Sequence, residues 1–364
     1  MTRRVALACQ GGGSHTAFAA GVLDRLLAEE RLDFEVVGLS GTSGGAICAF
    51  ATWFGLATEG RETARRLLAG VWDGLGADGP YDELLNAAGV GFARAHATGA
   101  PLPNVSPYAT PASGWGRLTL RRALESAVDP DALADVVGRR DGSVPRLEVG
   151  AVDVQRGSFV TFDERTVSHD AVLVSAAVPT LFEAAPVTAG DGTTRWYWDG
   201  LFSQNPPLND LFVGAEGRAD RPDETWVIQI NPQRESELPT SLNAIADRRN
   251  ELGGNLSVNQ ELRTVRTLNR WAAEDELGGV YRPAAVPRPP VDPRARAGGA
   301  VPRSDRGRVH ADRRQLRPDR VRRKRKRGVE YVPVGAGGSG SPGRTGGQRR
   351  RRPRRQRRGR RLRP

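Results

Sequence analysis

The stretch Val36-Val37-Gly38-Leu39-Ser40-Gly41-Thr42-Ser43-Gly44-Gly45 decides how this chain folds. Its first four residues are apolar and predict a buried strand, and the apolar run 46–51 that follows predicts a helix. Ser43 is the centre of a G-x-S-x-G sequence, in which the flanking glycines allow a sharp turn that exposes the hydroxyl. A helix that begins just after Ser43 also directs its N-terminal amides at the serine, which favours negative charge there.

A second glycine cluster, Gly11-Gly12-Gly13, lies about 30 residues upstream in a similar setting. A predicted strand at 5–9 precedes it, and residues 17–29 follow with helical spacing of apolar side chains. Consecutive glycines leave their amides uncovered, as acyl transfer requires for an oxyanion. Taken alone, the cluster fits a nucleotide-phosphate loop or a plain tight turn equally well. Thr16 breaks the G-x-G-x-x-G spacing and no G-K-[ST] follows, so neither nucleotide motif is complete.

A serine nucleophile needs a base, and the histidines are poor candidates for it. The chain has four, His15, His96, His169 and His310, and each is read more readily as a surface or helix-capping residue. The α/β-hydrolase fold, which carries a Ser-His-acid triad, is also disfavoured, because only one strand–helix unit precedes the elbow here. An acidic base is therefore the better candidate.

Asp199 is that candidate, at the end of the aromatic strand pattern Trp196-Tyr197-Trp198 and directly before Gly200. By itself an Asp-Gly pair after a strand most often marks a turn. The order of glycine cluster, serine elbow and Asp-Gly resembles the patatin-like phospholipase family. Residues 175–182, which read SAAVPTLF, are similar to a further block that the family carries before its aspartate.

The resemblance implies a three-layer α/β/α fold with a mainly parallel central sheet. It implies a Ser43/Asp199 dyad that cleaves carboxylic esters of (phospho)lipids through an acyl-enzyme, with no cofactor and no metal. Asp199 would take the Ser43 proton, which requires a raised pKa in a partly desolvated place. Two-residue alternation along the strand suggests that Trp196 and Trp198 flank it, but they fit ordinary core aromatics equally well. The amides of the glycine cluster would hold the oxyanion. The resemblance assigns these glycines: Gly11, Gly12 and Gly13 to the oxyanion hole, and Gly41, Gly45 and Gly200 to the elbow and the aspartate motif.

The chain departs from the family pattern at two places. Ser14, His15 and Thr16 follow the three glycines, where family members place one residue, then Arg or Lys, then Gly. Leu201 stands where the family prefers a small residue after Asp-Gly. Neither change removes a reacting group, but both are expected to lower activity.

Residues 1–285 suffice for one α/β domain. Residues 73–116 are rich in Gly, Pro, Ala and Ser, and are expected to form a long surface loop or a lid over the acyl site. The apolar positions of the last helix are expected to pack on the core. The predicted strands are 5–9, 36–39, 147–154, 158–162, 195–198 and 225–230, and the predicted helices are 17–29, 45–57, 61–72, 118–127, 169–177 and 239–271. The apolar residues available to a lid are Val90, Phe92, Val105, Tyr108 and Trp115.

Charge separates the last part of the chain from the rest. Residues 1–285 carry 26 Arg, no Lys and 37 acidic residues, a net charge of −11, whereas residues 286–364 carry +23. Three readings of this Arg/Pro/Gly-rich segment stay open. It is a disordered arm that binds nucleic acid or anionic lipid, an inert tail, or a frame-shifted reading of a normal C-terminal helix. Nucleic acid is a partner only if the segment is genuine.

No run of about 18 apolar residues predicts a membrane span. Cys9 and Cys48 are expected to be free thiols in the core. A cytoplasmic enzyme acting on soluble esters or at a membrane surface is expected, with the lipid class and oligomeric state open. The alternative is a catalytically weak scaffold of the same family whose basic tail binds nucleic acid or membrane.

Overall fold

The computed structural model describes residues 2–30, 33–76, 106–139, 144–179, 181–213 and 222–274. Its sheet has seven strands in the order β5-β6-β3-β2-β1-β7, with β4 paired to β3. The strands are β1 Arg3–Cys9, β2 Phe34–Thr42, β3 Arg146–Asp153, β4 Ser158–Asp163, β5 Ala185–Thr188, β6 Thr194–Asp199 and β7 Glu224–Ile228. The α-helices are α1 Ala17–Leu27, α2 Gly44–Thr58, α3 Arg61–Gly74, α5 Pro111–Ala127, α6 Pro130–Val137, α7 His169–Ser175, α8 Asn209–Val213 and α9 Leu242–Ala273, and the 3-10 helices are η1 Gly13–Thr16, η2 Pro107–Ala109 and η3 Gly200–Phe202.

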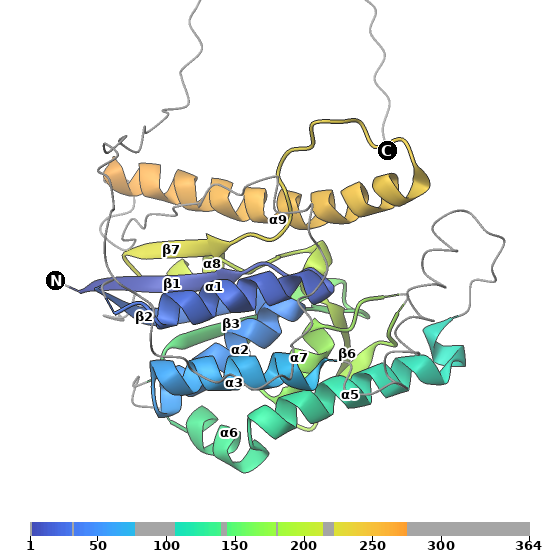
Figure 1. The fold of residues 1–364 in the computed structure, drawn as a ribbon, viewed down its shortest axis with the longest axis horizontal. Helices are drawn as coiled ribbons and strands as arrows, with labels where there is room; N and C mark the ends of the chain where they lie inside the picture. The colour runs from blue at the N-terminus through green and yellow to red at the C-terminus, as the bar shows by residue number, and fades with distance from the viewer. Residues whose placement is uncertain are drawn as a thin grey trace, which may run out of the picture. The chain divides into compact units, whose positions relative to one another are not determined.

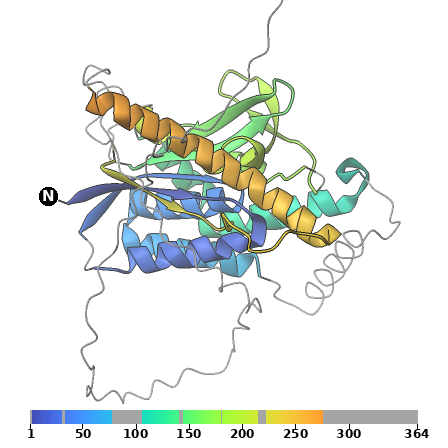
Figure 2. The ribbon, with the colours of Figure 1, turned by 90° about the horizontal axis from the view of Figure 1, so that it is seen from above.

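Helices cover both faces of the sheet, as the burial of β1 shows. Val5 and Leu7 belong to the larger apolar cluster, which includes side chains of α1, α2 and α3. Ala8, between them and Cys9, belongs to a smaller cluster with α8, β7 and α9. Since neighbouring strand residues point to opposite faces, both faces of β1 are buried. Figure 1 shows α9 beside β7 on one side and α2, α3 and α6 on the other, which is the expected three-layer α/β/α arrangement. Figure 2 shows α9 crossing over the sheet from above.

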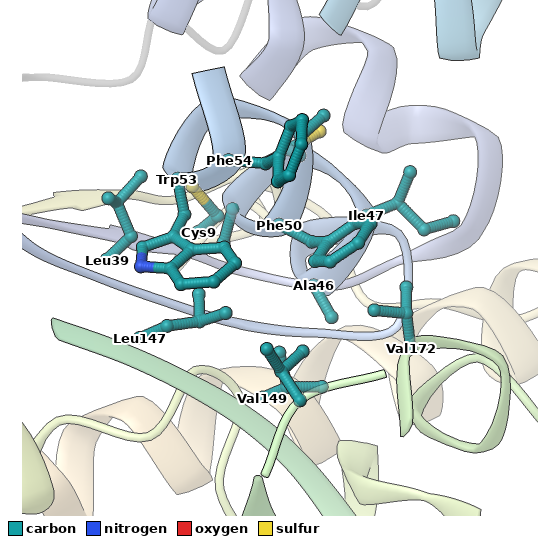
Figure 3. Close-up of a cluster of buried hydrophobic side chains, with 14 of the residues drawn as sticks. Cys9, Leu39, Ala46, Ile47, Phe50, Trp53, Phe54, Leu147, Val149 and Val172 are labelled. Atoms are coloured by element: carbon teal, nitrogen blue, oxygen red, sulfur yellow. The ribbon is translucent and has the colours of Figure 1, made fainter. Parts of the chain in front are cut away.

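The larger core is organised around α2, which is apolar on every side. Phe50 and Trp53 of α2 are fully buried, with ring centroids 6.4 Å apart. Figure 3 shows them above Leu147 and Val149 of β3. A helix that is apolar all round must be enclosed by protein, and α2 is buried in this way directly behind the elbow serine that precedes it.

The sheet is mixed. Strands β7, β1, β2 and β3 are parallel to their neighbours, as expected from the strand–helix alternation. Beyond them β3 pairs antiparallel with β4 and β6, and β5 pairs antiparallel with β6. The sequence prediction of a mainly parallel sheet is confirmed for the central strands. It did not include the antiparallel pairing at this edge, and β5 was not predicted as a strand.

One edge of β3 is shared end to end by two strands. Thr42, the last residue of β2, pairs with Gly150, and Asp199, the last residue of β6, pairs with Ala151. Strand β4 pairs along Glu148–Asp153 and so occupies the opposite edge. Because β2 runs parallel to β3 and β6 runs antiparallel, their carboxyl ends meet head to head at adjacent β3 residues. This register brings the serine elbow and the aspartate together.

The helix predictions need correction at α5, α6, α8 and α9, of which the five-residue α8 was not predicted at all. Helix α5 begins at Pro111, so residues 111–116 are helix and not loop; Thr110 is extended and proline fits the first helical turn. Helix α6 was missed, although Asp129 caps it by accepting hydrogen bonds from the amides of Asp131 and Ala132. In α9 only part of the apolar set packs on the sheet. Val258, Leu262 and Val265 are buried there, whereas Leu242, Ile245, Leu252 and Leu256 are exposed.

Some predictions fall on residues that the structure does not describe. Residues 77–105 of the loop or lid and the whole of 286–364 lie outside the described residues, and so do His96 and His310. Within the described ranges, Tyr108 and Trp115 are exposed. No helix in the described part of the chain combines the length and apolarity needed to cross a bilayer.

Candidate active site

Ser43 stands on a strained turn between β2 and α2. Its backbone angles are φ 58° and ψ −132°, and among the described residues it alone has a positive φ without being glycine. Such a conformation costs on the order of 1–3 kcal/mol and persists only where the surrounding structure imposes it. The elbow predicted from the sequence is therefore present as a strand–turn–helix.

Glycines make this turn sterically feasible. A Cβ on Gly45 would overlap the carbonyl oxygen of Cys9, and a Cβ on Gly41 would overlap that of Gly45. A Cβ on Gly11 would lie 2.9 Å from the Cβ of Ser43. The glycine cluster thus packs with its backbone directly against the elbow.

The end of α7 holds the backbone of both Ser43 and Asp199. The Ser43 amide donates to Ser175 Oγ at 3.0 Å, and that hydroxyl donates to the Gly150 carbonyl at 2.6 Å. Two residues on, the Ala177 carbonyl accepts a hydrogen bond from the Asp199 amide at 3.0 Å. Sequence reasoning noticed the block 175–182 through the family resemblance but gave Ser175 no task. The structure shows that it holds the strained turn in place.

Asp199 is fully buried at the end of β6. Its Oδ1 accepts a hydrogen bond from the Leu201 amide at 2.9 Å, while Oδ2 has no hydrogen-bond partner of normal geometry among the described residues. Burial raises the pKa of Asp199 from 3.8 to about 7, although the nearby Ser43 hydroxyl and the Leu201 amide both favour the charged form. The carboxylate is therefore a base poised near neutral pH, with one oxygen available and the serine hydroxyl beside it.

The tryptophans expected to flank Asp199 do not lie on its face of the strand. Trp196 is 43% exposed and Trp198 is half-buried, whereas Tyr197 is buried. Strand alternation places Asp199 on the same face as Tyr197 and opposite to Trp198. The expectation that Trp196 and Trp198 flank Asp199 was wrong because it misapplied the alternation: the two tryptophans share one face of the strand, and Asp199 lies on the other.

Gly11 does not offer a free amide to an oxyanion. Its N–H donates to Asn205 Oδ1 at 2.6 Å, so its assignment as an oxyanion donor conflicts with the structure. The amides of Gly12 and Gly13 have no acceptor among the described residues. The Gly44 amide is also available, because the first amides of a helix have no acceptor within it. Sequence reasoning left out Gly44, although in serine elbows the residue after the nucleophile commonly supplies a donor.

The atypical residues after the glycine cluster have different roles. Thr16 is buried, and its Oγ1 donates to the Gly13 carbonyl at 2.5 Å, so a side chain holds the loop where glycine is usual in the family. Thr16 Oγ1 also lies where a Cβ on Gly44 would be, so the loop and the start of α2 are in contact. Ser14 and His15 are exposed.

Among the described residues, three other nucleophile or base candidates, His169, Cys9 and Cys48, have structural environments. His169 is buried, its Nε2 lies 2.9 Å from the Val128 carbonyl, and its ring packs edge-on against Phe50. Burial lowers the pKa of His169, so it stays neutral in this contact. Cys9 and Cys48 are buried free thiols, as expected, and burial raises the pKa of both, that of Cys48 to about 12.

A three-layer α/β/α protein with a serine elbow facing a buried aspartate defines a class that differs from the histidine-dependent α/β-hydrolases. Residues 7–212 match the sequence profile of the family described as Patatin-like phospholipase, and the chain belongs to that family. No curated protein matches the chain. The solved structure of VipD from Legionella pneumophila aligns over 76% of this chain and 55% of its own, with 15% identity and a TM-score of 0.35. This chain thus spans little more than half the length of VipD.

Proposed function

We propose that this protein is a serine acyl hydrolase that uses a Ser43/Asp199 dyad to cleave carboxylic esters of lipids through an acyl-enzyme. One observation carries the proposal: a fully buried carboxyl whose pKa is raised to about 7 lies beside a serine on a strained turn. A carboxyl in such a place is costly for stability, and groups of this kind concentrate at functional sites.

In the proposed reaction Asp199 Oδ2 accepts the Ser43 hydroxyl proton while Oγ attacks the ester carbonyl. The carbonyl oxygen becomes an oxyanion, which the free amides of Gly12, Gly13 and Gly44 stabilise at the positive end of α2. The intermediate collapses, and Asp199 passes its proton to the departing alcohol. Water then gives a proton to Asp199 and attacks the acyl-enzyme. When the second intermediate collapses, Asp199 returns this proton to Ser43 Oγ and the carboxylic acid leaves.

The backbone contacts support this assignment of roles. Attack requires Oγ and the base within hydrogen-bond reach, and such contacts are often loose until a substrate binds. Ser175 and Ala177 accept hydrogen bonds from the backbone amides of Ser43 and Asp199, so one short segment positions both residues. The proposal extends to lipids presented at a membrane surface as well as to dispersed esters.

The test combines covalent labelling with turnover. The purified full-length chain is treated with a fluorophosphonate probe, and hydrolysis of short-chain p-nitrophenyl esters is measured in parallel. Ser43→Ala should lose both labelling and turnover, and Asp199→Asn should lose turnover by several orders of magnitude. The matched controls are Ser158→Ala and Asp135→Asn, whose side chains are exposed. A folded wild-type protein that neither labels nor turns over would rule the dyad out.

The charge of residues 286–364, +23, supports a second candidate function. In this candidate the catalytic domain is weak and the basic segment binds nucleic acid or an anionic membrane through phosphates. Deleting 286–364 distinguishes the two functions. Polyanion binding that is salt-sensitive and lost on deletion supports the second, and full esterase activity without the segment supports the first.

A further inference from the structure

A group of buried, neutral polar side chains lies next to the glycine cluster and does not include Ser43 or Asp199. Asn205 comes from the segment after β6, Gln10 follows β1, Gln229 follows β7, and Asn255 and Ser257 belong to α9. All five are at most 7% exposed. Buried amides and hydroxyls cost free energy unless they are hydrogen-bonded, so a cluster of this size calls for a reason.

The side chain of Asn205 makes two hydrogen bonds to the backbone of Gly11. Its Oδ1 accepts from the Gly11 amide at 2.6 Å and its Nδ2 donates to the Gly11 carbonyl at 3.2 Å. The Gly11 N–H also fixes which end of the Asn205 amide carries the oxygen, because only oxygen can accept there. Both peptide groups that flank Gly11 are therefore held in one orientation.

These two hydrogen bonds determine the direction of the Gly12 N–H. In a trans peptide the C=O and N–H groups point in opposite directions. With the Gly11 carbonyl turned to Asn205, the Gly12 N–H of the same peptide points away from Asn205. Gly12 is half-buried and its amide has no acceptor among the described residues, whereas Gly11 is buried. We infer that, within the glycine cluster, the Gly12 N–H is the oxyanion donor. Asn205 is then the positioning residue that orients this N–H.

Helix α9 in turn holds Asn205. The backbone N–H of Asn205 donates to Ser257 Oγ at 2.8 Å, and the Ser257 hydroxyl donates to the Ser203 carbonyl at 2.7 Å. A Cβ on Gly254 would lie 3.1 Å from Asn205 Nδ2, so a larger residue would crowd the cluster.

Asn255 extends the same support to the strand that leads into the loop. Its Oδ1 accepts from Gln10 Nε2 at 3.3 Å and from Gln229 Nε2 at 2.7 Å. Gln10 Oε1 accepts from the amides of Ile230 and Asn231, both at 3.0 Å. Because α9 lies beyond residues 7–212, the family match does not contain this support. The inference makes α9 part of the active-site framework.

The test rests on the proposed function and uses the full-length chain. Wild type, Asn205→Ala, Asn205→Asp and Ser257→Ala are compared with Asn250→Ala, an exposed asparagine on α9. Fluorophosphonate labelling run to completion counts the competent sites, and its rate reports reactivity per site. Steady-state hydrolysis gives kcat and KM, and its pH profile reports Asp199.

Losing one oxyanion donor costs about 10²–10³ in kcat, and a donor left in place but misaimed should cost less. We therefore expect Asn205→Ala to lower kcat and the labelling rate per site roughly 10–100-fold. KM should stay within about twofold and the pH profile should not shift, because ground-state binding and Asp199 are untouched. Asn205→Asp keeps an acceptor for the Gly11 amide and should fall between Asn205→Ala and wild type. Asn250→Ala should match wild type.

A rate per competent site within about twofold of wild type in Asn205→Ala would overturn the inference, and so would a loss confined to the number of competent sites. If Asn205→Ala does not fold, Ser257→Ala decides by the same criteria, since it removes the hydroxyl that holds the Asn205 backbone amide and the Ser203 carbonyl and leaves the Asn205 side chain in place. An unlabelled but folded wild type would instead refute the proposed function, and the inference with it.

Discussion

Replacing Asp199 by asparagine should make the protein more stable at neutral and alkaline pH while removing its activity. The native state holds this carboxyl in a buried place where its pKa is about 7, against 3.8 for an unperturbed aspartate. Between these two values the native state keeps a proton that the unfolded chain has lost. The wild-type free energy of unfolding therefore falls as pH rises from about 4 to 7, and the loss is complete above pH 7.

The size of the effect follows from the pKa shift. At 1.36 kcal/mol per pKa unit, the cost of the buried carboxyl is about 1.7 kcal/mol at pH 5 and about 4 kcal/mol at pH 8. Asparagine has the same shape and carries no charge, and its oxygen can still accept from the Leu201 amide. The stability advantage of Asp199→Asn over wild type should therefore grow by about 2.5 kcal/mol between pH 5 and pH 8.

The assay is urea unfolding of both proteins at pH 5 and pH 8, followed by the fluorescence of the seven tryptophans. Equal m-values would show that the same surface is exposed on unfolding in each case. The control is Asp135→Asn, an exposed aspartate whose replacement should leave the difference independent of pH. An advantage that does not change between the two pH values, or an Asp199→Asn protein less stable than wild type at pH 8, would refute the reasoning.

Three further predictions concern the same site. The kcat/KM for a neutral ester should rise with pH through an apparent pKa near 7, because the proposed reaction needs the charged form of Asp199; a profile measured from pH 5 to 9 checks this. Ser175→Ala should destabilise the protein by about 1–3 kcal/mol, because it leaves the buried Ser43 amide without an acceptor, and should lower kcat; thermal unfolding and turnover measure the two effects. Gly45→Ala should yield no soluble folded protein because its Cβ would overlap the Cys9 carbonyl, whereas Gly253→Ala, whose Cβ meets open space in α9, should raise stability by up to about 1 kcal/mol; expression tests and calorimetry separate these outcomes.

Much of the fold could be predicted from local sequence because its signals are local. Alternating or continuous apolar runs marked six of the seven strands, and β5, only four residues long, was too short to show a pattern. The cap of α6, Asp129 before Pro130, was also readable and was overlooked. The exposed leucines of α9 could not be separated from its buried ones by periodicity, because apolar residues occur on both faces of that helix.

The sequence by itself determined the candidate reacting groups: a serine on a glycine-flanked elbow, a glycine cluster upstream, and an aspartate after an aromatic strand. Each of these depends on a few neighbouring residues. Only the tertiary structure decided how they meet, because the pairing of β2 and β6 along one edge of β3 joins residues far apart in the chain. It also decided which amides are free, since Asn205 takes that of Gly11. The burial that raises the pKa of Asp199 arises from tertiary packing, so it could not be predicted from the residues next to Asp199 in the sequence.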